Sequence, residues 1–300
     1  MISKIGILTG GVSAEREISL KSSDAVEKAC RELGYAVELI IIDGNIQMII
    51  PELMRVDFIF IALHGGKGEN GVIQGLLDSL NIPYNGSGVL ASSLGMEKSL
   101  TKQLAKSHNI KTPDWNIFEY SDESKDNSPN KFPVVVKPSA DGSTVGLSIV
   151  RSQTEMEDAI KLANKYDGKI MVEDYIEGRE LTVTIIGQLV YPIVEIIPKH
   201  NIYDYECKYE KGMSEYICPA AISDKLTSKI QNSALCIFNI LQCSGYARAD
   251  FILDKNNVPW FLEINTLPGM TTTSLVPKSA MAAGISFNDL IQMIINNSVK

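Results

Sequence analysis

Four polar residues interrupt two apolar segments late in the chain, in the sequence YARADFIL and the following VPWFLEIN. They are Arg248, Asp250, Glu263 and Asn265. Charged side chains usually mark a solvent-exposed, salt-bridged face, but carboxylates among Phe, Ile, Leu and Trp need a cation to offset their lost hydration. Hard oxygen ligands without paired Cys or His favour Mg²⁺ or Mn²⁺ over zinc. Magnesium held by few carboxylates commonly takes further ligands from substrate phosphates, which indicates a nucleotide.

The two apolar segments predict the strands of a hairpin, spanning residues 246–253 and 258–264. A four-residue loop at 254–257 would place Arg248 opposite Glu263, with Asp250 diagonal to Glu263. Because side chains alternate along a strand with a period of two, Asn265 falls on the same face as Glu263. One face of one hairpin is therefore predicted to carry all four polar groups.

Composition narrows the class of protein. The chain has 300 residues, 45% of them hydrophobic, which predicts a soluble globular protein of one to three domains. A net charge of −8 argues against a broad nucleic-acid-binding surface. Five cysteines without a CxxC pair indicate reduced thiols. No leader sequence and no apolar run of ~18 residues is evident, so we expect a cytoplasmic protein without a membrane partner.

The N-terminal part predicts a doubly wound parallel sheet. Strands are expected at residues 4–8, 37–42 and 57–63, with a helix at 13–33. Ligands of such sheets bind at the carboxyl ends of the strands. Two polar segments follow those ends, GGVSAERE at residues 10–17 and HGGKGENG at 64–71. The residues alone do not decide whether His64 is structural or binds a ligand, or whether Arg16, Glu17 and Glu69 are merely solvated.

A second phosphate-binding feature is expected in the middle of the chain. The strand FPVVVKP at residues 132–138 ends beside the loop SADGSTVG at 139–146, and a strand follows at 147–150. A lysine beside loop amides and hydroxyls suits the phosphates of a nucleotide, although an ordinary hairpin with an edge lysine is the alternative. The P-loop motif GxxxxGK[ST] is absent.

Other segments predict the remaining helices, strands and loops. Helices are expected at residues 96–108, 226–242 and 286–297, and strands at 170–172 and within 181–197. Residues 201–220 predict a long loop, of the kind that often serves as a lid. The segment GSGVLA at 86–91 fits a dinucleotide fingerprint only weakly, because it does not follow the first strand. A dehydrogenase would leave the polar hairpin unexplained, while a nucleotide-binding regulatory module without turnover stays open.

Six motifs in the order SAERE, HGGKGENG, DGSTVG, YECKY, RADF and EINTLPGMT resemble the ATP-grasp ligases, and among them most the D-alanine–D-alanine ligases. The resemblance implies an α/β chain in which an ATP-grasp fold follows an N-terminal doubly wound parallel-sheet domain. It implies a substrate-binding domain at 1–95, a central ATP-grasp subdomain at 96–180, and a catalytic subdomain at 181–300 with a lid at 201–220. Family members commonly form homodimers.

The implied activity is the ATP-dependent ligation of two D-alanines through a D-alanyl phosphate, for peptidoglycan precursor synthesis. A ligase joining D-alanine to D-serine or D-lactate, or another ATP-grasp carboxylate–amine ligase, is the alternative. Relatives that use D-lactate carry a histidine in place of the lid tyrosine. The only histidine of this lid, His200, stands nine residues before Tyr209, which predicts a dipeptide product.

The same resemblance assigns the site residues. Two magnesium or manganese ions are expected on Asp250, Glu263 and Asn265. The expected catalytic residues are Glu15, Ser143, Tyr209, Arg248, Gly269 and Ser274. ATP is expected to contact Lys98, Lys137, Ser143, Thr144, Glu173, Asp174, Ile176, Glu180 and Lys208. The D-alanines are expected to contact Glu15, His64, Arg248, Gly269, Ser274 and Leu275.

Within these sets the resemblance implies particular roles. Glu15 would bind the ammonium of the first D-alanine, and Tyr209 would hydrogen-bond with Glu15 and Ser143. Arg248 and the Gly269 amide would face the tetrahedral intermediate. The carboxylate of the second D-alanine would lie against the Ser274–Leu275 pair, while Lys98, Lys137 and Lys208 contact phosphate. Glu173, with the backbone of Asp174 and Ile176, would meet the adenine, and Glu180 the ribose.

Overall fold

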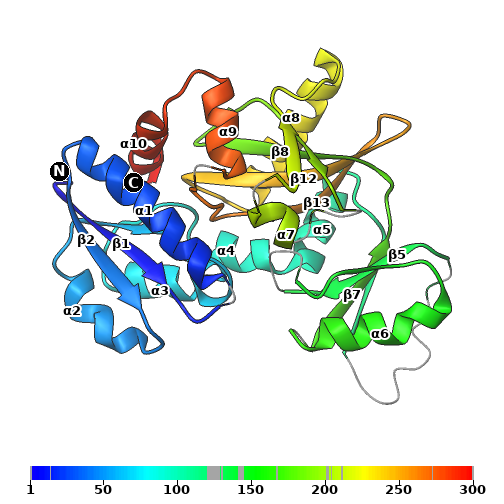
Figure 1. The fold of residues 1–300 in the computed structure, drawn as a ribbon, viewed down its shortest axis with the longest axis horizontal. Coiled ribbons are helices and arrows are strands. Elements are labelled where there is room, and N and C mark those ends of the chain that lie inside the picture. Colours follow the sequence, from blue (N-terminus) through cyan, green and yellow to red (C-terminus); the bar gives the residue numbers. More distant parts are fainter. Residues whose placement is uncertain are drawn as a thin grey trace.

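Three sheets lie along the long axis of the molecule in Figure 1. The computed structural model describes residues 2–13, 15–119, 129, 131–140, 145–166, 168–200, 203, 205–210, 212–271 and 273–298. Within these residues the sheets contain three, four and six strands. None of the described helices combines the length and the hydrophobicity of a membrane-spanning segment.

The N-terminal sheet is parallel, as predicted. Its strands are β1 (Lys4–Gly10), β2 (Ala36–Ile42) and β3 (Phe58–Ile61), in the order β2-β1-β3. The crossover helix α1 (Arg16–Glu32) buries a stripe that includes Ile18, Val26 and Ala29, at the spacing of one helix face. Shorter elements complete this part: η1 (Ile46–Ile49), α2 (Ile50–Leu53), η2 (Gly66–Gly68), α3 (Val72–Ser79) and α4 (Val89–Met96).

The two ends of the chain share one hydrophobic core. The last helices, α9 (Leu275–Ala282) and α10 (Phe287–Ser298), contribute Val276, Leu290 and Ile294 to the cluster around the N-terminal strands. Figure 1 shows α10 beside α1, with both termini at the same end of the molecule. The division at residues 95 and 180 stays a prediction.

The central sheet is antiparallel and forms one wall of the site. Its strands are β4 (Trp115–Glu119), β5 (Val134–Pro138), β6 (Ser148–Val150) and β7 (Lys169–Asp174), in the order β4-β7-β5-β6. The helix α6 (Gln153–Asn164) packs on it through Met156, Ala159 and Ala163. The pairing of β5 with β6 confirms the predicted strand–loop–strand unit, although loop residues 141–144 lie outside the described part.

The C-terminal sheet carries the polar hairpin. Its strands are β8 (Gly178–Ile186), β9 (Leu189–Val190), β10 (Val194–Pro198), β11 (Ser214–Ile217), β12 (Tyr246–Asp254) and β13 (Pro259–Asn265). Helices α5 (Lys98–Ser107) and α8 (Asp224–Ile240) share a core with this sheet, which includes Ala105, Ile237 and Phe261. Residues of β8, β12 and β13, among them Glu180, Asp250 and Glu263, line the site described below.

The predicted register of this hairpin is wrong. The loop has three residues, 255–257, where four were predicted. Asp254 N donates to Val258 O at 3.1 Å across its base, and Asn257 adopts φ 59°. A bulge then leaves Leu262 without an opposite residue, since Phe251 pairs with Phe261 and the next pair is Asp250 with Glu263. Asp250 is therefore directly opposite Glu263, and Arg248 is opposite Asn265.

The predicted sharing of one face is nevertheless confirmed. Without the bulge, Glu263 would lie opposite Ala249 and its side chain would leave the opposite face of the sheet from Asp250. The extra residue Leu262 reverses that alternation and returns Glu263 and Asn265 to the face of Asp250. One inserted residue thus assembles the carboxylate pair.

The segment predicted as a loop at 201–220 contains regular structure. Its described residues include the short helix α7 (Tyr205–Tyr209) and strand β11, which pairs antiparallel with β10. The strand was missed because it is short and alternates between exposed and half-buried residues, with Glu215 and Ile217 facing out.

Candidate active site

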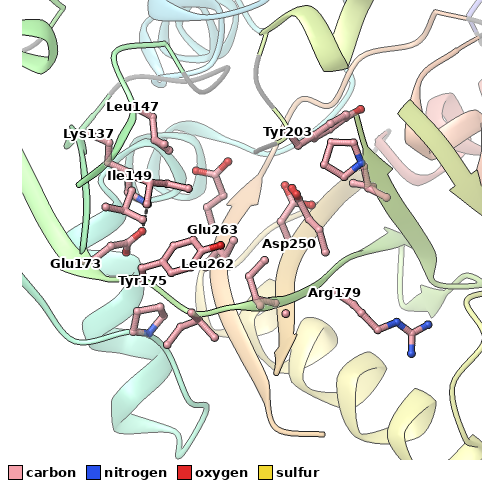
Figure 2. Close-up of a pocket in the computed structure, with 18 of the residues that line it drawn as sticks. Lys137, Leu147, Ile149, Glu173, Tyr175, Arg179, Tyr203, Asp250, Leu262 and Glu263 are labelled. Atoms are coloured by element: carbon pink, nitrogen blue, oxygen red, sulfur yellow. Dashed lines mark hydrogen bonds and ion pairs between the residues drawn. The ribbon is translucent and has the colours of Figure 1, made fainter. Parts of the chain in front are cut away.

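A cavity of about 480 Å³ opens between the central and C-terminal sheets. Its walls are largely apolar, with Val135, Ile149, Ile176 and Ile252 among the lining residues. Charged groups gather in it from Lys137, Glu173, Glu180, Asp250 and Glu263, and Figure 2 shows several of their side chains around the cavity. A largely apolar cleft that also holds several charged groups suits a ligand that has a flat ring and several charges.

The lysine end of this cavity is organised around Glu173. This carboxylate is buried and accepts from Lys102 Nζ at 2.5 Å and from Lys137 Nζ. Burial raises the pKa of Glu173, but the ammonium groups of Lys137 and Lys102 outweigh burial and hold it at about 2. Glu173 therefore stays ionised, and the two lysines keep fixed positions.

A second group of charges lies where the lid meets the cavity. Lys208, on α7, has its Nζ 5.5 Å from the centre of the Tyr203 ring, and burial lowers its pKa. Glu180 lies on β8, where burial and the nearby Asp250 raise its pKa to about 7. A cation brought into this cavity would meet the carboxylates of Glu180 and Asp250.

The hairpin presents its polar face to the same space. Asp250 accepts from Arg248 Nε at 2.9 Å and Nη2 at 2.8 Å, and from Thr182 Oγ1 at 2.5 Å. Lys98 Nζ lies 3.5 Å from Glu263 Oε2. Although burial raises the pKa of Glu263, Lys98 and the other nearby cations hold it at about 2.

The donor set fits a hard divalent cation. Asp250 and Glu263 line the cavity from opposite positions of the two strands, and Asn265 adds an amide oxygen next to them. Among the described residues, no three His, Cys, Asp or Glu side chains gather as a metal site. Two carboxylates and an amide do not fill an octahedron, so a magnesium ion here would need oxygens from a ligand.

A smaller cavity of about 100 Å³ adjoins the first. The two cavities share four lining residues, Lys98, Tyr203, Lys208 and Glu263. The smaller one is also lined by residues from the start of α1, the segment after β3, the lid and the segment after β13. A molecule in the smaller cavity would therefore meet the charged end of a molecule in the larger one.

Hydrogen bonds from distant parts of the chain close the smaller cavity. Tyr209 donates its hydroxyl to Glu15 Oε1 at 3.0 Å, which joins the lid to the start of α1. His64 is buried, with Nε2 at 3.0 Å from Ser22 Oγ and Nδ1 at 3.6 Å from Glu69 Oε1. Glu69 also accepts from Gly65 N at 3.0 Å, so it belongs to the cavity and not to a solvated face.

Backbone geometry sets the other side of this cavity. Gly269 lies in the segment between β13 of the C-terminal sheet and α9. A Cβ there would be 3.2 Å from Ser274 Oγ and 3.3 Å from His64 Cε1. Ser274 precedes α9, and its hydroxyl accepts from Thr271 N at 3.0 Å. Leu275 is buried in a cluster with Cys207 of the lid.

The predicted site residues converge on these two cavities. Every one of them that the structure describes lines one cavity or both. Ser143 and Thr144 lie outside the described residues. The sequence predicted no role for Lys102 or Tyr203, and it left the role of Glu69 open. A signal existed for Lys102, which stands one helical turn after Lys98.

Two family models match the chain. One, described as the D-ala D-ala ligase C-terminus, matches residues 104–296, and the other, described as the D-ala D-ala ligase N-terminus, matches residues 46–87. The first alone covers more than half of the sequence. The chain belongs to the D-alanine–D-alanine ligase family.

Relatives of this family align along nearly the whole chain. A D-alanine–D-alanine ligase of Aquifex aeolicus is 46% identical over 293 residues, covering 97% of this chain and 99% of that protein. One from Carboxydothermus hydrogenoformans is 43% identical over 308 aligned residues, covering 97% of each.

Solved structures of the family share the fold. A D-alanine–D-alanine ligase of Bacillus anthracis complexed with ATP superposes with a TM-score of 0.84 at 32% identity, covering 99% of this chain and 96% of that one. A D-Ala:D-Ser ligase of Enterococcus faecalis gives 0.85 at 26% identity, covering all of both chains. The ATP-grasp fold after an N-terminal parallel sheet is thus confirmed. The segment GSGVLA at residues 86–91, which fits a dinucleotide fingerprint weakly, lines neither cavity.

Proposed function

We propose that this chain joins two D-alanines to D-alanyl-D-alanine at the expense of ATP, through a D-alanyl phosphate, for peptidoglycan precursor synthesis. Membership of the family supports the reaction. The observation that carries it is the junction of the two cavities at Lys98, Tyr203, Lys208 and Glu263. There the terminal phosphate of a nucleotide and the carboxylate of an amino acid would meet among cations.

ATP is assigned to the larger cavity. Lys98, Lys137 and Lys208 are assigned to the phosphates, with Ser143 and Thr144 of the glycine loop as predicted partners. Glu173 and Ile176 are assigned to the adenine and Glu180 to the ribose. The Asp174 N–H already donates to Asp114 O at 2.9 Å, so we assign the carbonyl of Asp174, and not its N–H, to the base.

The D-alanines are assigned to the smaller cavity. Glu15, with His64 close by, would hold the ammonium of the first D-alanine, and its hydrogen bond from Tyr209 would fix its carboxylate. Ser274 and Leu275 would hold the carboxylate of the second. The small size of the cavity favours small side chains.

The chemistry needs no covalent bond to the protein. A carboxylate oxygen of the first D-alanine attacks the γ-phosphorus, and the bond to the bridging oxygen of ADP breaks. The amine of the second D-alanine then attacks the acyl carbon, and the carbon–oxygen bond to phosphate breaks. Arg248, held by Asp250, would stabilise the charge of the tetrahedral intermediate together with the Gly269 amide. The residues contribute orientation and electrostatic stabilisation.

Two magnesium or manganese ions are proposed as cofactors on Asp250, Glu263 and Asn265. When bound, such ions offset the developing charge on the phosphate oxygens. The half-buried position of Glu263 and its ionised carboxylate support the assignment. We also propose the division into three parts at residues 95 and 180, a homodimer, and a cytoplasmic location, where ATP is abundant.

The test is ADP release measured with D-alanine, D-serine, D-lactate or L-alanine as substrate, and then with equal D-alanine and D-lactate together, with products separated by mass. We expect D-alanine alone to support fast ADP release and to yield the dipeptide at pH 6 and pH 8. Release that does not depend on any amino acid would contradict the ligase. Substantial D-alanyl-D-lactate at pH 6 would contradict the product choice.

A further inference from the structure

A second lysine of α5 is fully enclosed, and none of the roles above uses it. Lys102 has 0% of its surface exposed. Its ammonium donates to Glu173 Oε2 at 2.5 Å and lies 5.4 Å from the centre of the Trp115 ring. Burial lowers the pKa of Lys102 to about 8, with Glu173 opposing that change, so most of the lysine is protonated at neutral pH. A buried ammonium is costly unless a paired carboxylate offsets its lost hydration, and Glu173 supplies that carboxylate.

In the part of the chain that the structure describes, Lys102 is connected to the larger cavity through Glu173. The two oxygens of Glu173 are divided between two lysines, with Oε2 on Lys102 and Oε1 on Lys137. Lys137 and Glu173 line the larger cavity, whereas Lys102 is not among its lining residues. Figure 2 shows Lys137 and Glu173 facing one another at the edge of that cavity.

The charges explain what Lys102 adds. With Lys102 present, the three groups sum to one positive charge beside the cavity. Without it, Glu173 and Lys137 would form a neutral buried pair, and their mutual attraction in a low dielectric is strong. Lys137 would then attract a phosphate less and would be drawn toward Glu173.

We propose that Lys102 is a positioning residue for ATP, which neutralises and orients Glu173 so that Lys137 presents its charge to the phosphates. This inference rests on the proposed function, in which Lys137 contacts the phosphates of ATP. Because Glu173 is also assigned to the base, the test must distinguish an effect on phosphate binding from an effect on adenine binding.

The experiment compares ATP with adenosine, which lacks phosphates, by calorimetric titration of the full chain in excess magnesium. Lys102→Met removes the charge at similar length. We expect its dissociation constant for ATP to rise about tenfold, as for loss of one charge-assisted interaction, while the constant for adenosine stays within about twofold. Equal losses for both ligands, or no loss for ATP, would overturn the proposal.

The same helix offers a matched control. Lys106 stands one turn further along α5, lies 5.2 Å from the centre of the same Trp115 ring, and pairs with Asp114 at the surface. It does not contact Glu173 in the described structure. Lys106→Met is expected to leave both dissociation constants within about twofold of the wild type.

A double variant tests the charge argument directly. Lys102→Met with Glu173→Gln again leaves one positive charge, on Lys137. Because the loss of the assigned adenine contact of Glu173 affects both ligands equally, we expect the ratio of the ATP and adenosine dissociation constants to return to within about threefold of the wild-type ratio. A ratio still about tenfold above the wild-type ratio in the double variant would overturn the proposal, even if Lys102→Met by itself fails to fold. A wild-type protein that does not bind ATP would instead refute the proposed function.

Discussion

The two cavities of the site are built in different ways. The larger one lies between strands of two sheets, and its charges are fixed by ion pairs such as those of Glu173 and Asp250. The smaller one collects Glu15, His64 and Tyr209 from segments far apart in the sequence, and hydrogen bonds hold it together. Charge in the first is set by neighbouring strands, whereas shape in the second depends on how loops and helix ends meet.

The two cavities are expected to control different properties of the enzyme. Paired charges aimed at a ligand act on phosphates and on the transition state. A small cavity closed by hydrogen bonds acts on which amino acid binds and how it is oriented. Variants in the smaller cavity should therefore affect D-alanine while sparing ATP, and variants at the junction should affect turnover most.

The largest effect is expected at the junction. Glu263 is the proposed metal ligand that lines both cavities. Glu263→Gln removes its charge, and we expect turnover to fall by about a thousandfold. Steady-state ADP release, with circular dichroism to establish folding, measures this. The control is Glu215→Gln on the exposed side of β11, which should change little. Full activity of Glu263→Gln at limiting magnesium would refute the assignment.

Arg248 tests the transition-state role. Arg248→Lys keeps the charge but loses the planar fork that binds Asp250 through two nitrogens. We expect turnover to fall by about a hundredfold while the dissociation constant of ATP changes by no more than about twofold. Unchanged turnover would mean that Arg248 serves only as an ion pair within the hairpin.

Gly65 tests the shape of the smaller cavity. It adopts φ 70°, and a Cβ would lie 2.7 Å from Glu15 Oε2. Gly65→Ala should raise the KM for D-alanine about tenfold and leave ATP binding unchanged, because the added carbon displaces the Glu15 carboxylate. The next residue supplies the control: Gly66 adopts φ 50°, but a Cβ there meets no atom within 4 Å. If both variants behave alike, backbone strain and not the Glu15 contact is responsible.

The smallest expected effect is that of the hydrogen bond between lid and α1. Tyr209→Phe removes the donor to Glu15, and we expect kcat/KM for D-alanine to fall about fivefold, in keeping with one lost hydrogen bond. Tyr35→Phe is the control, since its hydroxyl donates to Gln292 away from the site. A loss of ATP affinity equal to the loss for D-alanine would show that the lid does not separate the two cavities.

The polar hairpin shows how far the sequence leads. The period of two correctly predicted one face for Arg248, Asp250, Glu263 and Asn265, but through a wrong register. The three-residue loop and the bulge at Leu262 each shift the pairing by one residue, and both depend on backbone choices that an apolar pattern does not encode. Either shift by itself would have put Glu263 on the opposite face from Asp250, so the two errors cancelled.

Other features follow from packing and not from local pattern. A lysine on an amphipathic helix is usually exposed, so the position of Lys102 one turn after Lys98 did not by itself predict burial. The sequence left open whether Glu69 is solvated, because its approach to His64 depends on how a glycine-rich loop folds. The sharing of one core by α10 and β1 joins residues near opposite ends of the chain, which periodicity alone does not predict.

The central claim is that a carboxylate of D-alanine attacks the terminal phosphate of ATP where the two cavities meet. It is tested most directly with D-alanine carrying ¹⁸O in both carboxylate oxygens, followed by mass analysis of the phosphate released during dipeptide formation. The attack transfers an oxygen from carboxylate to phosphorus, so each phosphate should carry one ¹⁸O. Unlabelled phosphate released in step with the dipeptide would contradict the account.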